Sequence, residues 1–157
     1  MNTIELVETI RIERPIEVVR PHFMDFDHHI AQNVHKKVRF TIVEQEPGRV
    51  RIRQTVPVIG TDDMEITSSP DGAVTQRNIA GPNVGLVIAV QFRADGPNAT
   101  ELTATLNMPV SGWKALLKPL LKVMLRSIGR GALREDKQDL ESGYQPSDAA
   151  RRIYNAA

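Results

Sequence analysis

One long helical pattern, placed after a chain that otherwise reads mostly as strands, most limits how this sequence can fold. From Val110 to about Glu141, apolar residues recur three and four positions apart, which predicts a helix with a broad apolar face. These apolar residues are Trp113, Leu116, Leu117, Leu120, Leu121, Met124, Leu125 and Ile128. A sheet with one apolar face has to cover that face, and no other long helix is predicted. We therefore expect this helix to lie across a sheet.

The rest of the chain predicts strands separated by turn residues. Thr3–Glu13 alternates between apolar and polar residues, as a half-buried strand does. The segment from Pro15 to about Gln32 is mixed in character and interrupted by Pro21, which predicts two short helices. Six more strands follow, over 38–42, 50–56, a segment around Met64 and Ile66, 74–79, 84–92 and 102–108. We predict an α+β fold in which a curved antiparallel sheet of about seven strands wraps around the C-terminal helix.

This order of elements, over residues 3–142, resembles the helix-grip fold of START domains, polyketide cyclases and the wider SRPBCC superfamily. We predict one helix-grip domain over residues 1–142, followed by a peripheral C-terminal tail over residues 143–157. Curved strands around one helix seldom fill the space between them completely, so an apolar cavity is expected there. A resemblance of this kind concerns the fold and leaves the function open.

Polar residues at inward positions are the first candidates for ligand contacts. Most aliphatic residues of the strands are even-numbered, and on that register Glu8, Gln54 and Asp62 also point inward. Buried polar groups need partners or a ligand, so these three side chains could orient a bound molecule. Alternatively, they reach water at the strand ends, or a bulge shifts the register. The candidates on the helix are Trp113, Leu117, Leu120 and Met124.

A second group of candidates lies in a histidine-rich segment. All four histidines fall within the fourteen residues from His22 to His35. Two histidines and one carboxylate form the facial triad of non-haem iron(II) enzymes. Asp25-x-x-His28 together with His35, and the acidic run Glu135–Glu141, resemble the iron-binding motifs of Rieske-type ring-hydroxylating oxygenases, whose catalytic domains also adopt a helix-grip fold. The resemblance implies a metal site made of His35, Asp136 and one of His28 and His29.

The chain also departs from that oxygenase pattern. His28 and His29 are separated from His35 by more residues than the family motif has between its two histidines. The chain has no cysteine, so it has no cysteine ligands for a Rieske cluster. The alternative is that these polar residues only line or flank the mouth of a cavity.

Charge and composition exclude several other classes. The chain has 20 Lys and Arg against 19 Asp and Glu, and this near-neutrality argues against a nucleic-acid partner. No apolar run approaches the roughly 18–20 residues that span a bilayer, and the N-terminus does not resemble a signal peptide, so we expect a cytoplasmic protein. A basic row along the helix is either a solvated face or a contact for a membrane surface: Lys114, Lys118, Lys122, Arg126, Arg130 and Arg134.

Two functions remain in competition. The first is binding of a hydrophobic small molecule, which could be lipid-like, alicyclic or aromatic, between the sheet and the helix and without a cofactor. The second is a stand-alone enzyme that acts on such a ligand, through acid–base groups in the cavity or through a metal site holding non-haem iron or another divalent metal. The residue pattern leaves open whether the ligand is turned over.

Overall fold

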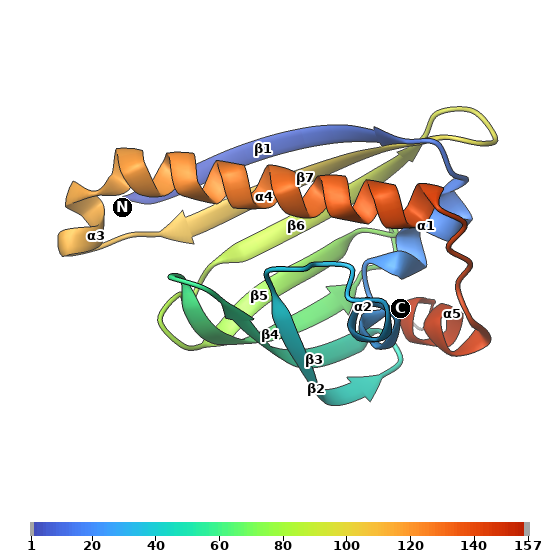
Figure 1. Cartoon of the computed structure of the whole chain (residues 1–157), viewed down its shortest axis with the longest axis horizontal. Helices are drawn as coiled ribbons and strands as arrows, with labels where there is room; N and C mark the ends of the chain where they lie inside the picture. Colours follow the sequence, from blue (N-terminus) through green and yellow to red (C-terminus); the bar gives the residue numbers. More distant parts are fainter. Residues whose placement is uncertain (1, 156–157) are drawn as a thin grey trace.

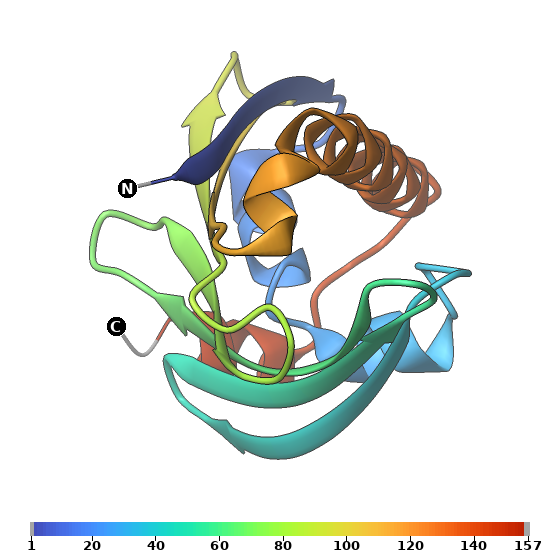
Figure 2. The ribbon, with the colours of Figure 1, turned by 90° about the vertical axis from the view of Figure 1, so that its left-hand side faces the viewer.

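The computed structural model describes residues 2–155 and shows the predicted α+β fold. Seven antiparallel strands form one sheet in the order β1-β7-β6-β5-β4-β3-β2. The strands are β1 (Thr3–Ile12), β2 (Arg39–Glu46), β3 (Arg49–Val56), β4 (Gly60–Ser68), β5 (Val74–Ala80), β6 (Val87–Ala94) and β7 (Thr100–Pro109). The helices are α1 (Ile16–His22), α2 (Phe26–Ala31), α3 (Trp113–Leu116), α4 (Lys118–Glu141) and α5 (Asp148–Tyr154). The sheet curves around α4, which runs beside β1 (Figure 1) and is seen nearly end-on in Figure 2.

The predicted inward register of the strands is confirmed. The pairing aligns even-numbered residues with even-numbered residues, as in Ile4 with Met108 and Ile52 with Met64. Because side chains alternate along a strand, this pairing carries the inward face from one strand to the next. A shift between β4 and β5 at Asp63 and one in β2 after Ile42 are local irregularities.

Two predicted boundaries differ from the structure. The helix predicted from Val110 to Glu141 is divided into α3 and α4. Pro119 lies in the first turn of α4, where a residue without an N–H group breaks no helical hydrogen bond. The strand predicted from Val84 begins at Val87, because Gly85 adopts a positive φ of 90° in the preceding turn. Within residues 2–155, no helix has both the length and the apolar character needed to cross a membrane.

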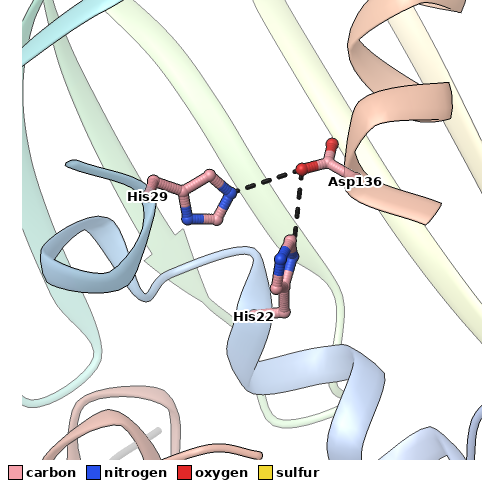
Figure 3. Close-up of side chains that lie close together, drawn as sticks. All are labelled: His22, His29 and Asp136. Carbon is pink, nitrogen blue, oxygen red and sulfur yellow. Dashed lines mark hydrogen bonds and ion pairs between the residues drawn. The ribbon is translucent and has the colours of Figure 1, made fainter. Parts of the chain in front are cut away.

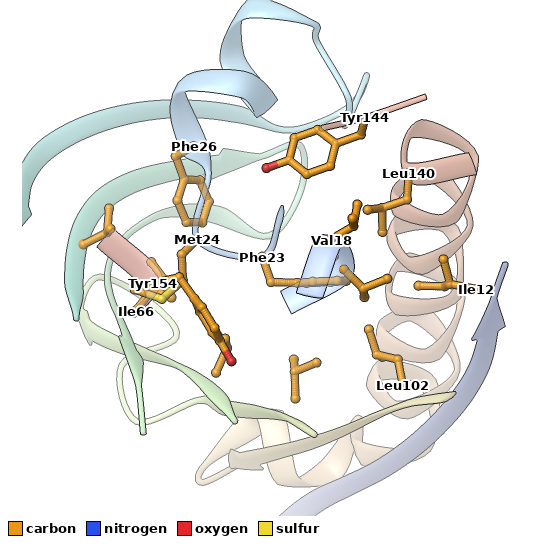
Figure 4. Close-up of a cluster of buried hydrophobic side chains, with 14 of the residues drawn as sticks. Ile12, Val18, Phe23, Met24, Phe26, Ile66, Leu102, Leu140, Tyr144 and Tyr154 are labelled. Atoms are coloured by element: carbon orange, nitrogen blue, oxygen red, sulfur yellow. The ribbon is translucent and has the colours of Figure 1, made fainter. Parts of the chain in front are cut away.

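The larger hydrophobic core lies at the end of the sheet where α1, α2 and the end of α4 meet (Figure 4). It includes Phe23, Met24, Phe26, Ile66, Leu102 and Leu140. A smaller core at the other end joins β1 to α4 through Ile4, Leu6, Met108 and Leu125. The two cores hold α4 to the sheet at both ends.

The segment after Glu141 is not the peripheral tail predicted over residues 143–157. Tyr144, Ala150 and Tyr154 are buried, and both tyrosines belong to the larger core. The Tyr154 hydroxyl donates a hydrogen bond to the carbonyl of Gly72 at 2.8 Å. The prediction failed because the segment is mostly polar, and its few apolar side chains pack against distant elements that periodicity does not reveal.

Candidate functional site

A cavity of about 410 Å³ lies between the concave face of the sheet and α4. Its wall is mainly apolar and includes Leu6, Ile52, Met64, Val90, Leu106 and Leu125. Concave, mostly apolar cavities of this size with a few polar groups are typical of small-molecule sites. The expected cavity is therefore present in the structure.

The cavity residues expected on the helix separate into two groups. Trp113 and Met124 line the cavity, whereas Leu117 and Leu120 do not. Leu120 is 65% exposed and Leu117 is 41% exposed. The apolar pattern is wide enough to cover more than one face of the helix, so periodicity alone did not show which part of it meets the sheet. Leu121, one position after Leu120, does line the cavity.

The three inward polar residues expected on the strands all line the cavity, but two of them have protein partners. The Asp62 carboxylate accepts hydrogen bonds from the Asn83 backbone N–H at 2.9 Å and from its side-chain amide at 2.8 Å. Glu8 forms ion pairs with Arg126 at 3.4 Å and Arg130 at 3.0 Å on α4. Asp62 and Glu8 thus hold the walls of the cavity together.

Asn78 on β5 is a polar cavity residue that was missed from the sequence. It is buried and lines the cavity, as Gln54 and Gln76 also do. Its side-chain oxygen has no hydrogen-bond partner among residues 2–155. A buried polar atom without a partner is costly, so a ligand that donates a hydrogen bond would satisfy it. The sequence did contain a signal for this residue: Asn78 is an even-numbered residue of a predicted strand, and even-numbered strand residues were predicted to point inward.

One end of the cavity carries imidazole and carboxylate groups. His29, His35 and Asp136 all line it. The Oδ1 atom of Asp136 lies 3.1 Å from His35 Nε2 and 3.3 Å from His29 Nε2. Burial by itself would raise the pKa of Asp136, but the hydrogen bonds with His29 and His35 hold it well below the usual range. Asp136 is therefore a buried carboxylate anion.

The protonation of His35 complements this anion. Burial by itself would lower its pKa, but the hydrogen bond and the charge of Asp136, together with Glu135, raise the pKa of His35 above its ordinary value. A histidine with a raised pKa beside a carboxylate, at the wall of an apolar cavity, can act on a bound molecule as an acid or base.

The structure brings together the carboxylate and the two histidines implied by the oxygenase resemblance, with His29 rather than His28 as the first histidine. His29, His35 and Asp136 meet, whereas His28 Nε2 instead lies 2.7 Å from Asp139 Oδ2. His22, which was not among the candidate ligands, lies beside them with its Nδ1 atom 3.8 Å from Asp136 Oδ1. It was missed because it belongs to α1, and the motif begins at Asp25 beyond that helix. Metal binding itself stays a prediction.

Neither protein-family models nor curated proteins gave a match to this chain, but many solved structures did. The ZhuI aromatase/cyclase from Streptomyces sp. R1128 matches with a TM-score of 0.76 at 14% identity, over 99% of each chain. A START superfamily protein from Mycobacterium smegmatis matches with a TM-score of 0.71 at 14% identity, over 88% of this chain and 97% of its own. Norcoclaurine synthase from Thalictrum flavum, solved with dopamine and hydroxybenzaldehyde, matches at 0.68 and 10% identity, over 92% of this chain and 90% of its own. The chain has the START-type helix-grip fold. At these identities the likeness concerns the fold.

The mouth of the helix-grip cavity is apolar and unusually exposed. Trp113 lines the cavity although it is 65% exposed, and Val58 in the loop before β4 lines it at 96% exposure. Lys114 donates a hydrogen bond to the carbonyl of Pro82 at 2.8 Å, which ties α3 to the loop before β6. These loops and α3 together form the rim through which a ligand would pass. The membrane-surface contact considered for the basic row stays a prediction.

Proposed function

We propose that this protein binds a hydrophobic small molecule in the cavity between the sheet and α4. The observation that carries the proposal is the combination of a largely apolar wall with the unpartnered side-chain oxygen of buried Asn78. Apolar surface supplies the affinity through removal of the ligand from water, and a small number of polar groups set its orientation.

The cavity favours one arrangement of such a ligand. Phe23, Phe26 and Phe40 line the wall, while Gln54 comes from β3 and Gln76 and Asn78 from β5, the two strands that flank β4. We infer a ligand with an alicyclic, aromatic or lipid-like body and at least one hydrogen-bond donor that faces Asn78. The relatives in fold include an aromatase/cyclase and an enzyme solved with two small aromatic compounds, which supports an aromatic or cyclic body.

A substitution that fills the cavity tests the proposal. We expect the wild-type protein to raise the fluorescence of anilinonaphthalene sulfonate. Ala104 on β7 lines the cavity, so Ala104→Phe should abolish this gain. Ala89 on the neighbouring β6 is odd-numbered and outside the lining, so Ala89→Phe is the matched control and should leave dye binding unchanged. Circular dichroism would show that both variants fold. Equal dye binding by the two variants would contradict a ligand site in this cavity.

The alternative is an enzyme that acts on the same ligand. The observation that favours it is that His29 and His35 reach the cavity wall while sharing the carboxylate of Asp136, since imidazole–carboxylate pairs serve as general acids and bases. The small molecules extracted from the wild-type protein and from His35→Gln should be compared by mass spectrometry. An enzyme predicts that the variant retains a precursor of different mass, whereas a binding protein predicts the same compound in both.

A further inference from the structure

The donor atoms of three buried side chains converge at the inner end of the cavity. His22 Nδ1, His29 Nε2 and Asp136 Oδ1 all lie within 4.8 Å of one another. Figure 3 shows the two imidazole rings, from α1 and α2, directed at the same carboxylate oxygen on α4. His22 is 0% exposed, and His29 and Asp136 are each 5% exposed.

The hydrogen bonds on the outer side of each ring determine which nitrogen faces inward. His29 Nδ1 lies 2.8 Å from the backbone carbonyl of Asp25, which can only accept, so Nδ1 carries a proton and Nε2 is the nitrogen left to bind an ion. His22 Nε2 lies 2.8 Å from the Asp139 carboxylate and likewise donates to it. The inward nitrogen of His22 is then Nδ1.

The inward nitrogen of His22 has no protein partner. Nδ1 makes no hydrogen bond to any other part of residues 2–155, although the side chain is completely buried. A cation between the two inward nitrogens and the carboxylate of Asp136 would give this buried nitrogen the partner that it lacks.

We propose that His22, His29 and Asp136 bind a divalent first-row metal ion such as Zn²⁺ or Fe²⁺. Ligands about 2.0–2.2 Å from one ion lie about 3.0–3.6 Å from each other in octahedral or tetrahedral geometry. The two nitrogen-to-oxygen distances, 3.3 Å and 3.8 Å, need only small side-chain shifts to reach that range. Two imidazoles and one carboxylate, without a thiolate, suit this class of ion.

The surrounding residues have the outer-sphere arrangement that metal-binding histidines usually have. Asp139 accepts from His22 and also from His28 Nε2 at 2.7 Å, so His28 supports the site from outside it. The Tyr144 hydroxyl donates to the Asp25 side chain at 2.7 Å, which helps to fix the residue whose carbonyl holds His29. Such contacts fix the ring orientation and tautomer of a ligand.

The remaining coordination positions would face the cavity, because His29 and Asp136 line it and His22 does not. The ion would therefore meet an oxygen or nitrogen atom of a molecule bound there. His35 contacts Asp136 Oδ1 at 3.1 Å but is not one of the three converging ligands. In this assignment His35 orients the carboxylate, which differs from the ligand set that the oxygenase resemblance implies.

Metal titration of protein prepared without a histidine tag and stripped with a chelator tests the proposal. We expect calorimetry with Zn²⁺ to show one ion per chain with a Kd of about 10 µM or tighter. His29→Gln and Asp136→Asn should each abolish detectable binding, whereas the outer-sphere controls His28→Gln and His35→Gln should weaken it by about 10–100-fold at most. No Zn²⁺ binding by the wild-type protein, or loss of binding only in the two controls, would overturn the assignment.

A second measurement needs no substitution and so does not depend on the folding of a variant. In imidazole ¹⁵N spectra, Zn²⁺ should shift the signals of His22 Nδ1 and His29 Nε2 most. Largest shifts at His28 would contradict the proposal. Because neither experiment uses a cavity ligand, a negative result would leave the proposed small-molecule site standing, and failure of dye binding would leave the metal site standing.

Discussion

The carboxylate of Asp62 and the amide groups of Asn83 join β4 to the loop before β6 through two hydrogen bonds, of 2.9 Å and 2.8 Å. Asp62 is only 2% exposed, so its oxygens depend on these donors for hydrogen bonds. Gly81 lies against the same carboxylate, since a Cβ atom there would come 2.5 Å from Asp62 Oδ1. The pair therefore sets the shape of the cavity rim on this side.

Removing this carboxylate should destabilise the fold. We expect Asp62→Ala to lower the free energy of unfolding by about 1–3 kcal/mol, because the buried donors of Asn83 lose their acceptor. Urea denaturation followed by circular dichroism measures the change. Asp63→Ala is the control: its partner Arg53 is at 2.8 Å in an exposed ion pair, so the cost should be below about 1 kcal/mol. Equal costs for the two variants would show that the Asp62 contacts do not stabilise the rim.

Two leucines of α4 should differ sharply in their contribution to stability. Leu125 is 8% exposed and packs in the smaller core, whereas Leu120 is 65% exposed. Leu125→Ala should lower the free energy of unfolding by about 2–5 kcal/mol, and Leu120→Ala by less than about 1 kcal/mol. Chemical denaturation of both variants checks this. A large loss at Leu120 would mean that another surface covers it in solution.

Trp113 should report on ligand entry. It is the only tryptophan of the chain, and it lines the cavity mouth while 65% exposed. A hydrophobic molecule that binds in the cavity would remove water from the indole ring, so tryptophan emission should shift to shorter wavelength. The shift should be absent in Ala104→Phe and present in Ala89→Phe. Binding that leaves the emission unchanged in the wild-type protein would place the ligand away from the mouth.

Ionisation of Tyr154 should destabilise the protein at alkaline pH. Burial raises the pKa of the Tyr154 hydroxyl, which donates to Gly72. A tyrosine whose pKa is higher in the folded than in the unfolded state contributes stability below the unfolded pKa of about 10, and this contribution is lost as the pH rises through the folded pKa. We expect the free energy of unfolding to fall above about pH 10, and to fall less in Tyr154→Phe. An equally steep fall in the variant would assign the effect to other groups.

Much of the fold follows from patterns within single segments. The alternation in Thr3–Ile12 and the helical spacing after Lys118 arise from side-chain direction, which local backbone geometry sets. Glu8, Gln54 and Asp62 point inward as predicted, because the strands pair even-numbered residues with even-numbered residues. By themselves, these patterns determined the order of elements, the curved sheet and the presence of a cavity.

Only the tertiary structure decided which partner each side chain meets. Leu120 and Leu121 are neighbours in the same apolar pattern, yet only Leu121 lines the cavity, because the rotation of α4 on the sheet depends on packing at both of its ends. His22 lies with His29 and Asp136, while His28 contacts Asp139, because the consecutive helices α1 and α2 meet the distant helix α4 there. A spacing motif describes distances along the chain, and the meeting of side chains across the fold depends on how the helices pack.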